Sequence, residues 1–379
     1  MFNTGYLAAV TSASPAPAPP RPSRLTWRRA RPLIALAAAL AAAGWLLTVV
    51  ESSSPPTSVP MQQAASASPP PAVSISGKLA DGSEYTPLFY ADAATSVGTA
   101  SSAGTDDRLV LRSPAGEREL RRVASDRYAQ FLGFTAADRV LYWAESAALP
   151  DGTYETRMWR APLDGSAPPA SLTADTGAAV FFDSEFDLVV AGGRLHWIAA
   201  PPDDSARTEL RSVALTGGAV TTTSFEGRFR HTSWPWLLSV DEQAPLVLAN
   251  PETGERRTVT RAAAESVVCT PTWCRSMVQA GDRHLYDVRH PDGTARRRVP
   301  GDLTAITVDA AAAGRYELFT ELNVDQVRLV AYDLDSSSMR ILSPSIGITS
   351  TRAGVVWWAD RPANPTAWLS IDLRTPLDR

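Results

Sequence analysis

The chain alternates short apolar strands with tight polar turns, in a unit that recurs about seven times between Asp106 and the C-terminus. Each unit has a strand with apolar residues at every second position, a turn rich in Gly, Asp or Ser, and a second strand with a polar face. Successive units lie roughly 36 to 52 residues apart, the spacing of four-stranded propeller blades. The first strands of the units contain Leu109–Leu111, Met158–Arg160, Leu210–Val213, Leu246–Leu248, His284–Tyr286, Val327–Val330 and Trp368–Ile371.

This repeat predicts an all-β fold, a β-propeller with seven blades. Six or eight blades are the alternatives, because Leu88–Gly104 shows no clear alternation. Further apolar strands lie between the hairpins, as blades of four strands require. Several carry wide aromatic residues suited to packing between neighbouring blades, at Leu141–Trp143, Leu195–Trp197 and Val356–Trp358.

The last hairpin predicts how the ring closes. After Leu373 the sequence has no residues left for an outer strand. A ring without closure would expose unpaired strand edges. Since Val73–Gly77 alternates cleanly at the other end of the repeat region, we expect it to pair with Trp368–Leu373.

An uncharged apolar stretch, Leu33–Val50, precedes the repeats. Its length as a helix is about 27 Å, just enough to cross a bilayer. Arginines flank it on the N-terminal side and Glu51 follows it, which predicts a single-pass membrane protein with its N-terminus in the cytoplasm and its C-terminal domain outside. The alternative is a cleaved signal peptide that releases a secreted protein, since small residues occupy Ala41–Ala43.

Composition divides the chain into four parts. Residues 1–32 are rich in Pro, Ala and Ser and are expected to form a disordered cytoplasmic tail, and 33–50 is the predicted transmembrane helix. Residues 51–72 form a Pro- and Ser-rich linker, and 73–379 form the propeller domain.

Charge excludes one class of partner. Five of the 36 basic residues precede Leu33, and Glu51 is the first of the 40 acidic residues, which leaves 31 basic against 39 acidic residues after Glu51. Electrostatic binding to nucleic acid needs a clustered positive surface. We therefore expect no nucleic-acid partner.

The segment Val268–Arg275 carries a family resemblance. Its residues Cys269, Thr270, Pro271, Thr272, Trp273 and Cys274 are similar to a Cys-x-Pro-x-Trp-Cys element. With the hairpins and the export segment, this makes the region from about Val73 to Arg379 resemble the TolB-like (WD40-like) extracytoplasmic β-propellers of high-GC Gram-positive bacteria. The founding family has six blades. The resemblance implies a propeller outside the cytoplasm, without a shared catalytic set, and transfers no site residue except the cysteine pair.

Cys269 and Cys274 are the only cysteines, and an exported domain lies in an oxidising compartment. A structural disulfide is the favoured interpretation, with a redox-active pair or a metal site as alternatives. Two thiols without a nearby His pair suit zinc poorly.

No catalytic motif occurs in the sequence. The four histidines have no metal-ligand spacing, and neither a nucleophile elbow nor a phosphate-binding Gly-rich loop is found. We therefore expect no catalytic residue, no metal and no cofactor.

The most suggestive binding feature is the segment from Arg230 to Trp236. Arg230 and His231 stand beside Trp234 and Trp236 at a junction between blades, and Trp273 lies in the cysteine loop. Aromatic rings beside polar donors suit a peptide or carbohydrate surface. The alternative is that Trp234 and Trp236 belong to the core of an inner strand.

These observations predict a membrane-anchored extracytoplasmic binding or scaffold module of the cell envelope. Its partner would be an envelope protein, a peptide or a glycan. The alternatives are an exported propeller enzyme acting on glycan, as a lyase or hydrolase, and a single-span signalling relay that uses residues 1–32. The enzyme would need carboxylates or a histidine converging on the axis of the ring.

Overall fold

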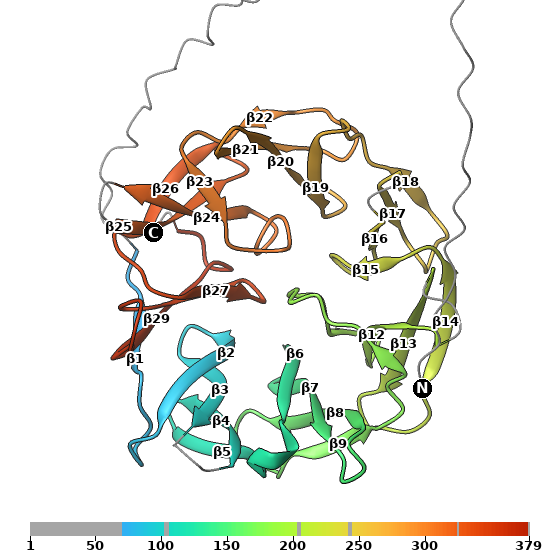
Figure 1. Cartoon of the computed structure of the whole chain (residues 1–379), viewed down its shortest axis with the longest axis vertical. Coiled ribbons are helices and arrows are strands. Elements are labelled where there is room, and N and C mark those ends of the chain that lie inside the picture. The colour runs from blue at the N-terminus through green and yellow to red at the C-terminus, as the bar shows by residue number, and fades with distance from the viewer. Residues whose placement is uncertain (1–69, 102–105, 203–205, 242–244, 324–325, 378–379) are drawn as a thin grey trace, which may run out of the picture. The chain divides into compact units, whose positions relative to one another are not determined.

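A computed structural model describes residues 70–101, 106–202, 206–241, 245–323 and 326–377. They lie within one compact unit, Gln63–Arg379. Figure 1 shows the strands arranged as a ring of small sheets that follow one another in chain order. The predictions for residues 1–69, including the membrane span, fall outside the described residues. Among the described residues, no helix has the length and apolar character needed to cross a bilayer.

The ring has seven sheets, which confirms the all-β, seven-bladed prediction. In blades 1 to 6 the first strand lies nearest the axis and the last strand lies at the rim (Figure 1). Blade 1 contains β2 (Glu84–Asp92), β3 (Thr95–Ser101), β4 (Asp107–Ser113) and β5 (Gly116–Val123). Blade 2 contains β6 (Gln130–Ala137), β7 (Val140–Ala148), β8 (Tyr154–Pro162) and β9 (Ala170–Thr173). Blade 3 contains β10 (Ala178–Ala179), β11 (Val189–Ala191), β12 (Arg194–Ala200), β13 (Arg207–Ala214) and β14 (Thr221–Glu226).

Blades 4 to 7 repeat the pattern, and a single 3₁₀ turn, η1 (Ser125–Arg127), joins blades 1 and 2. Blade 4 contains β15 (Phe229–His231), β16 (Leu237–Ser239), β17 (Val247–Ala249) and β18 (Arg256–Thr258), and blade 5 contains β19 (Glu265–Cys269), β20 (Cys274–Ala280), β21 (Arg283–Arg289) and β22 (Arg297–Arg298). Blade 6 contains β23 (Leu303–Ala305), β24 (Tyr316–Asn323), β25 (Gln326–Asp333) and β26 (Ser338–Ser343). Blade 7 contains β27 (Thr349–Arg352), β28 (Val355–Ala359), β29 (Ala367–Asp372) and β1 (Val73–Ser76).

The N-terminal strand closes the ring as predicted. β1 pairs antiparallel with β29 as the outer strand of blade 7, with Val73 opposite Ser370 and Ser76 opposite Ala367. The indole Nε1 of Trp368 also donates to the carbonyl of Tyr85 in blade 1, at 2.8 Å. Strand pairing and this buried hydrogen bond therefore join the two ends of the repeat region.

The region without a clear pattern forms the first two strands of blade 1. Gly98 lies in the middle of β3, where a Cβ atom would stand 2.2 Å from the carbonyl oxygen of Thr86 on β2. A glycine is required there by the close approach of two backbones, and it interrupts the apolar alternation. The strand exists because its neighbours cover it, with Val97 and Ala100 fully buried.

Candidate functional site: the axial loop cap

The connections between the first and second strands of the blades differ around the ring. In blades 7, 1 and 2 they are two-residue turns, and we call these three the plain blades. In blades 3 to 6 they are longer, and we call these four segments together the loop cap. The segments are 180–188, 232–236, 270–273 and 306–315. Figure 1 shows that the segments before β12 and between β23 and β24 extend toward the centre of the ring.

Asp309, in the loop of blade 6, joins three blades. Both of its carboxylate oxygens accept from the Ser184 hydroxyl of blade 3 at 2.9 Å, and one accepts from the Glu185 amide at 2.9 Å. Arg230 of blade 4 donates to the same carboxylate at 2.7 Å and to the Val308 carbonyl at 3.0 Å. The side chains of Ser184, Arg230 and Asp309 are buried, and charge-assisted bonds are stronger there than in water.

A second buried ion pair fixes the loop of blade 6 to blade 5. Arg275 donates to Glu317 at 2.7 Å, with 7% and 1% of the two side chains exposed. Arg275 also donates to the carbonyl oxygens of Thr307 and Asp309. Burial raises the pKa of Glu317, and the charge of Arg275 opposes that rise.

The loop of blade 3 crosses to the opposite side of the ring. Asp183 accepts a hydrogen bond at 2.5 Å from Arg352 in blade 7. Glu185 lies close by, and burial together with the charge of Asp309 raises its pKa to about 7, against the opposing effect of the Ala353 and Gly354 amides. The cap therefore contains a carboxyl group that titrates near neutrality.

Two further groups in the cap have shifted pKa values. Burial raises the pKa of Asp187 to about 6, although its carboxylate accepts from the amides of Phe182 and Ser184. Burial also lowers the pKa of His231 to about 3, so this imidazole is neutral. Its Nδ1–H donates to the Phe186 carbonyl at 3.1 Å. His231 therefore holds the blade 3 loop in place without carrying a charge.

A small cavity lies beside these carboxylates. Its volume is about 50 Å³, and its lining includes Asp183, Glu185, Asp309, Thr307 and Thr351. Sites for small organic ligands usually enclose several hundred Å³, so this cavity has room for water but not for a sugar ring. Within the ranges that the structure describes, no group of three His, Cys, Asp or Glu side chains is placed to hold a metal ion.

The residues that the sequence nominated as a binding surface occupy different environments. Arg230 and His231, on β15, and Trp236 are buried, whereas Trp234 is partly exposed in the turn that follows β15. The ring of Trp234 lies 4.1 Å from that of His196 in blade 3. Trp236 packs in the apolar core of blades 4 and 5. Arg230, His231 and Trp234 therefore connect blades, and of these three Trp234 is the one that is partly exposed.

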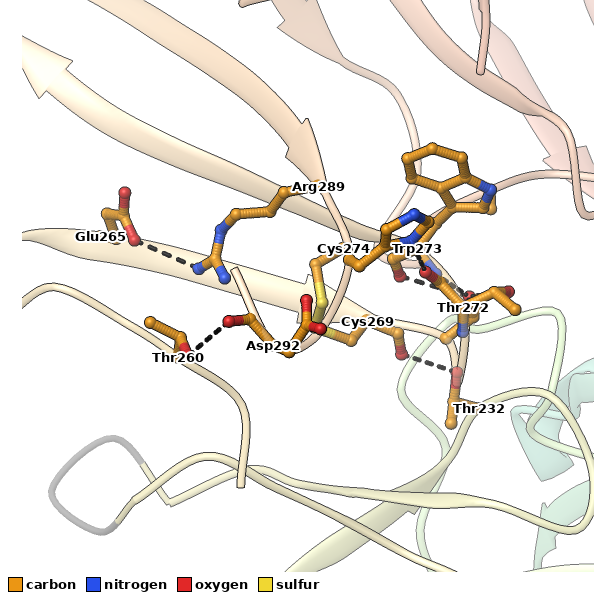
Figure 2. The surroundings of a disulfide bond; sticks show 12 residues. Thr232, Thr260, Glu265, Cys269, Thr272, Trp273, Cys274, Arg289 and Asp292 are labelled. Carbon is orange, nitrogen blue, oxygen red and sulfur yellow. Dashed lines mark hydrogen bonds and ion pairs between the residues drawn. A yellow bond between two sulfur atoms is a disulfide. The ribbon is translucent and has the colours of Figure 1, made fainter. Parts of the chain in front are cut away.

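The predicted disulfide joins Cys269 to Cys274 across the first turn of blade 5. Thr232 of the blade 4 loop donates to the Cys269 carbonyl at 2.8 Å, which ties the two loops together (Figure 2). Trp273 points away from the sulfur atoms (Figure 2) and lies over His290, with 4.5 Å between ring centroids. The disulfide thus fixes one segment of the loop cap and presents a partly exposed indole beside it.

Sequence reasoning missed the carboxylates at the centre of the cap. Ser184 and Asp309 are separated by 125 residues, and no motif links them. The one feature of the sequence that could have indicated these loops is the length of segments 180–188 and 306–315, which exceed the two-residue turns of the plain blades.

The chain is therefore a seven-bladed β-propeller in which loops from four blades meet over the axis. No family model matches it, and no curated protein is found as a relative. Similar solved structures include the propeller domain of the Trilobed protease from Pyrococcus furiosus, 12% identical with a TM-score of 0.41 over 61% of this chain and 78% of that one. A putative TolB from Agrobacterium tumefaciens is 14% identical with a TM-score of 0.39, over 60% and 84%. An uncharacterized protein from Listeria monocytogenes is 9% identical with a TM-score of 0.44, over 72% and 88%.

Proposed function

We propose that this chain is a membrane-anchored, extracytoplasmic binding or scaffold module of the cell envelope, and that the loop cap is its recognition surface. The observation that carries the proposal is the network centred on Asp309, which joins the loops of blades 3, 4 and 6. A surface already fixed in one conformation loses less entropy when a partner binds. With only about 50 Å³ enclosed, the cap suits the surface of a protein better than a small molecule.

Site-specific photo-crosslinking in living cells tests this recognition surface. Val308 in the cap and Ile341 on β26 have equal exposure, 42% each, and so make a matched pair of positions for a benzophenone amino acid. We expect a discrete crosslinked protein from Val308 and from the exposed Thr272, and none from Ile341. Identical products from all three positions, or no product from either cap position, would contradict the proposal.

Membrane anchoring is tested separately from binding. The apolar stretch 33–50 would keep the full chain in the membrane pellet after alkaline extraction, whereas a variant without it would be released. A mature N-terminus at Gly44 or later, found by mass spectrometry of the natural protein, would favour the secreted alternative instead.

A catalytic role is the second candidate, and Glu185 is the observation that favours it. A carboxyl group with a pKa of about 7 has the property of a general acid, and glycosidases use such a group beside a second carboxylate, the position that Asp183 would take. The size of the cavity weighs against it. Release of reducing ends from cell-wall glycan by the purified protein, abolished in Glu185→Gln, would establish catalysis and displace the binding module as the main proposal.

A further inference from the structure

A larger cavity lies between blades 1 and 2, and we call it the blade 1–2 pocket. Its volume is about 370 Å³, within the range of ligand sites, and its lining includes Arg121, Arg127, Glu145, Glu155, Arg157 and Trp159. These residues lie on β5, η1, β7 and β8, near the connections from β5 to β6 and from β7 to β8. Since strands in a blade alternate in direction, these connections lie at the end of the ring opposite the loop cap.

The charges lining the blade 1–2 pocket are unequal. Arg121 forms two hydrogen bonds of 2.7 Å with Glu145, and Arg157 pairs with Glu155 at 2.6 Å. Arg127 is exposed, and its described bond is from Nε to the Ala148 carbonyl, at 2.8 Å. Three guanidinium groups therefore face two carboxylates. The pocket has the charge and the donors to accept one carboxylate, which a guanidinium binds through two parallel hydrogen bonds.

The lining includes one aromatic ring, that of Trp159. Trp159 stacks on Trp143 with 6.2 Å between ring centroids, and the guanidinium of Arg121 lies 3.9 Å from the centroid of Trp159. Tyr128 follows Arg127 in the sequence and is 67% exposed. Tyr128 also has a φ of +46°, a conformation that residues other than glycine rarely adopt and that is found more often at functional sites.

We propose that the blade 1–2 pocket binds a segment of a partner protein that presents one carboxylate beside an apolar side chain. Arg127 pairs with the carboxylate, and Tyr128, next to it in the sequence, packs against the apolar neighbour. Tyr, Trp and Arg are the residues that contribute most to protein–protein affinity. This site is separate from the loop cap and does not depend on it.

Two other ligand classes fit less well. A single carboxylate balances the three guanidinium and two carboxylate groups of the lining, whereas a doubly charged phosphate would leave an excess negative charge there. A sugar ring binds proteins by stacking on an exposed aromatic face, whereas Arg121 already covers a face of Trp159. An acidic peptide therefore matches both the charge and the geometry.

Peptide display on the purified full-length chain tests the proposal. A random heptapeptide library is selected on the wild-type protein and counter-selected on Arg127→Gln, in which the substituted side chain is at the surface. We expect enriched peptides to carry Asp or Glu next to an apolar residue. Their binding should fall about tenfold or more in Arg127→Gln, the loss expected when a charge-assisted bond is removed. Tyr128→Ala should weaken it as well, and Arg283→Gln, at an exposed site in blade 5, should leave it unchanged.

The outcomes separate the possibilities. Equal binding to wild type and Arg127→Gln, no carboxylate preference, or no enrichment would each overturn the proposal. Retention of polygalacturonate that depends on Arg127 and exceeds that of the peptides would assign the pocket to an acidic glycan and overturn it too. Unchanged unfolding midpoints in urea for Arg127→Gln and Tyr128→Ala ensure that a lost signal reports the pocket and not the fold.

Discussion

The plain blades and the blades of the loop cap are similar antiparallel sheets, but they contact their neighbours through different kinds of interaction. Where blade 1 meets its neighbours, aromatic rings make the contact: Phe89 stacks on Phe134 in blade 2, and Tyr90 lies 5.2 Å from Trp357 in blade 7. Blades 4 to 6 also have an aromatic contact, Tyr286 with Phe319, but they add buried ion pairs between blades, Arg230–Asp309 and Arg275–Glu317.

The difference shows that closing the ring and covering its axis depend on different interactions. Apolar contacts between sheets are non-directional and need only complementary volume, which a repeating strand pattern supplies. Loops that cross the axis carry backbone and side-chain polar groups into a buried place, and these groups need partners there. The ion pairs between blades in which both side chains are less than 10% exposed therefore occur where the loops are long, whereas the Arg121–Glu145 pair between blades 1 and 2 leaves Arg121 26% exposed.

The largest expected effect comes from the apolar side of this comparison. Phe89→Ala removes a fully buried ring between blades 1 and 2 and is expected to lower the free energy of unfolding by about 4 kcal/mol. Urea unfolding followed by circular dichroism measures it. Leu322→Ala, at a site 71% exposed, is the control and should change stability by less than about 0.5 kcal/mol. A similar cost for both variants would mean that the blade interface is not the source of stability.

Arg275→Met, in the loop cap, is expected to cost about 3 kcal/mol, because it leaves Glu317 buried without its cation. The double variant Arg275→Met/Glu317→Leu should recover most of that loss, since an apolar pair avoids the unpaired charge. The exposed pair Arg283–Asp302 is the control, and Arg283→Met should cost less than about 1 kcal/mol. If the double variant is no more stable than Arg275→Met, the cost of Arg275→Met does not come from leaving the Glu317 carboxylate without a cation.

Removing the disulfide by Cys269→Ser/Cys274→Ser should cost about 2 kcal/mol, the loop-entropy value for a ring this short. The effect is expected to be local. Hydrogen exchange should accelerate in 232–236 and 270–273, which the Thr232 bond connects, and remain unchanged in the plain blades. Faster exchange in blades 1 and 7 would show that the cap and the plain blades are coupled.

Glu185→Gln is expected to raise stability, unlike the other variants, and the effect should depend on pH. Burial raises the folded-state pKa of Glu185 to about 7, whereas the unfolded side chain ionises near 4.5. Between these values the folded state binds more protons, so Glu185 lowers stability as pH rises from about 4.5 to 7, and the penalty is constant above that.

The variant should therefore equal the wild type near pH 4.5 and exceed its stability from pH 7 upward, as measured by urea unfolding across pH. Glu226→Gln, at a rim site, is the control and should change little. A stability difference that does not vary with pH would remove Glu185 as a group titrating near neutrality.

The strand pattern alone determined much of the fold. Alternation around Leu109, Met158 and Leu329 places the third strands of three blades, because successive side chains point to opposite faces of a sheet. The closing strand β1 was also predictable, since the last hairpin had no outer partner and Val73–Gly77 was the unused alternating segment. The disulfide was predictable because Cys269 and Cys274 are the only cysteines and the domain was expected in an oxidising compartment.

Which residues meet in the loop cap and in the blade 1–2 pocket was decided only by the tertiary structure. Asp309 meets Ser184 and Arg230 through loops whose sequences have no periodicity, and residues from distant blades become neighbours only after the ring closes. The blade 1–2 pocket likewise joins Arg121 and Trp159 from separate sheets. A repeating pattern specifies local strand geometry, whereas the burial, charge balance and pKa of a group such as Glu185 depend on neighbours that only the folded ring provides.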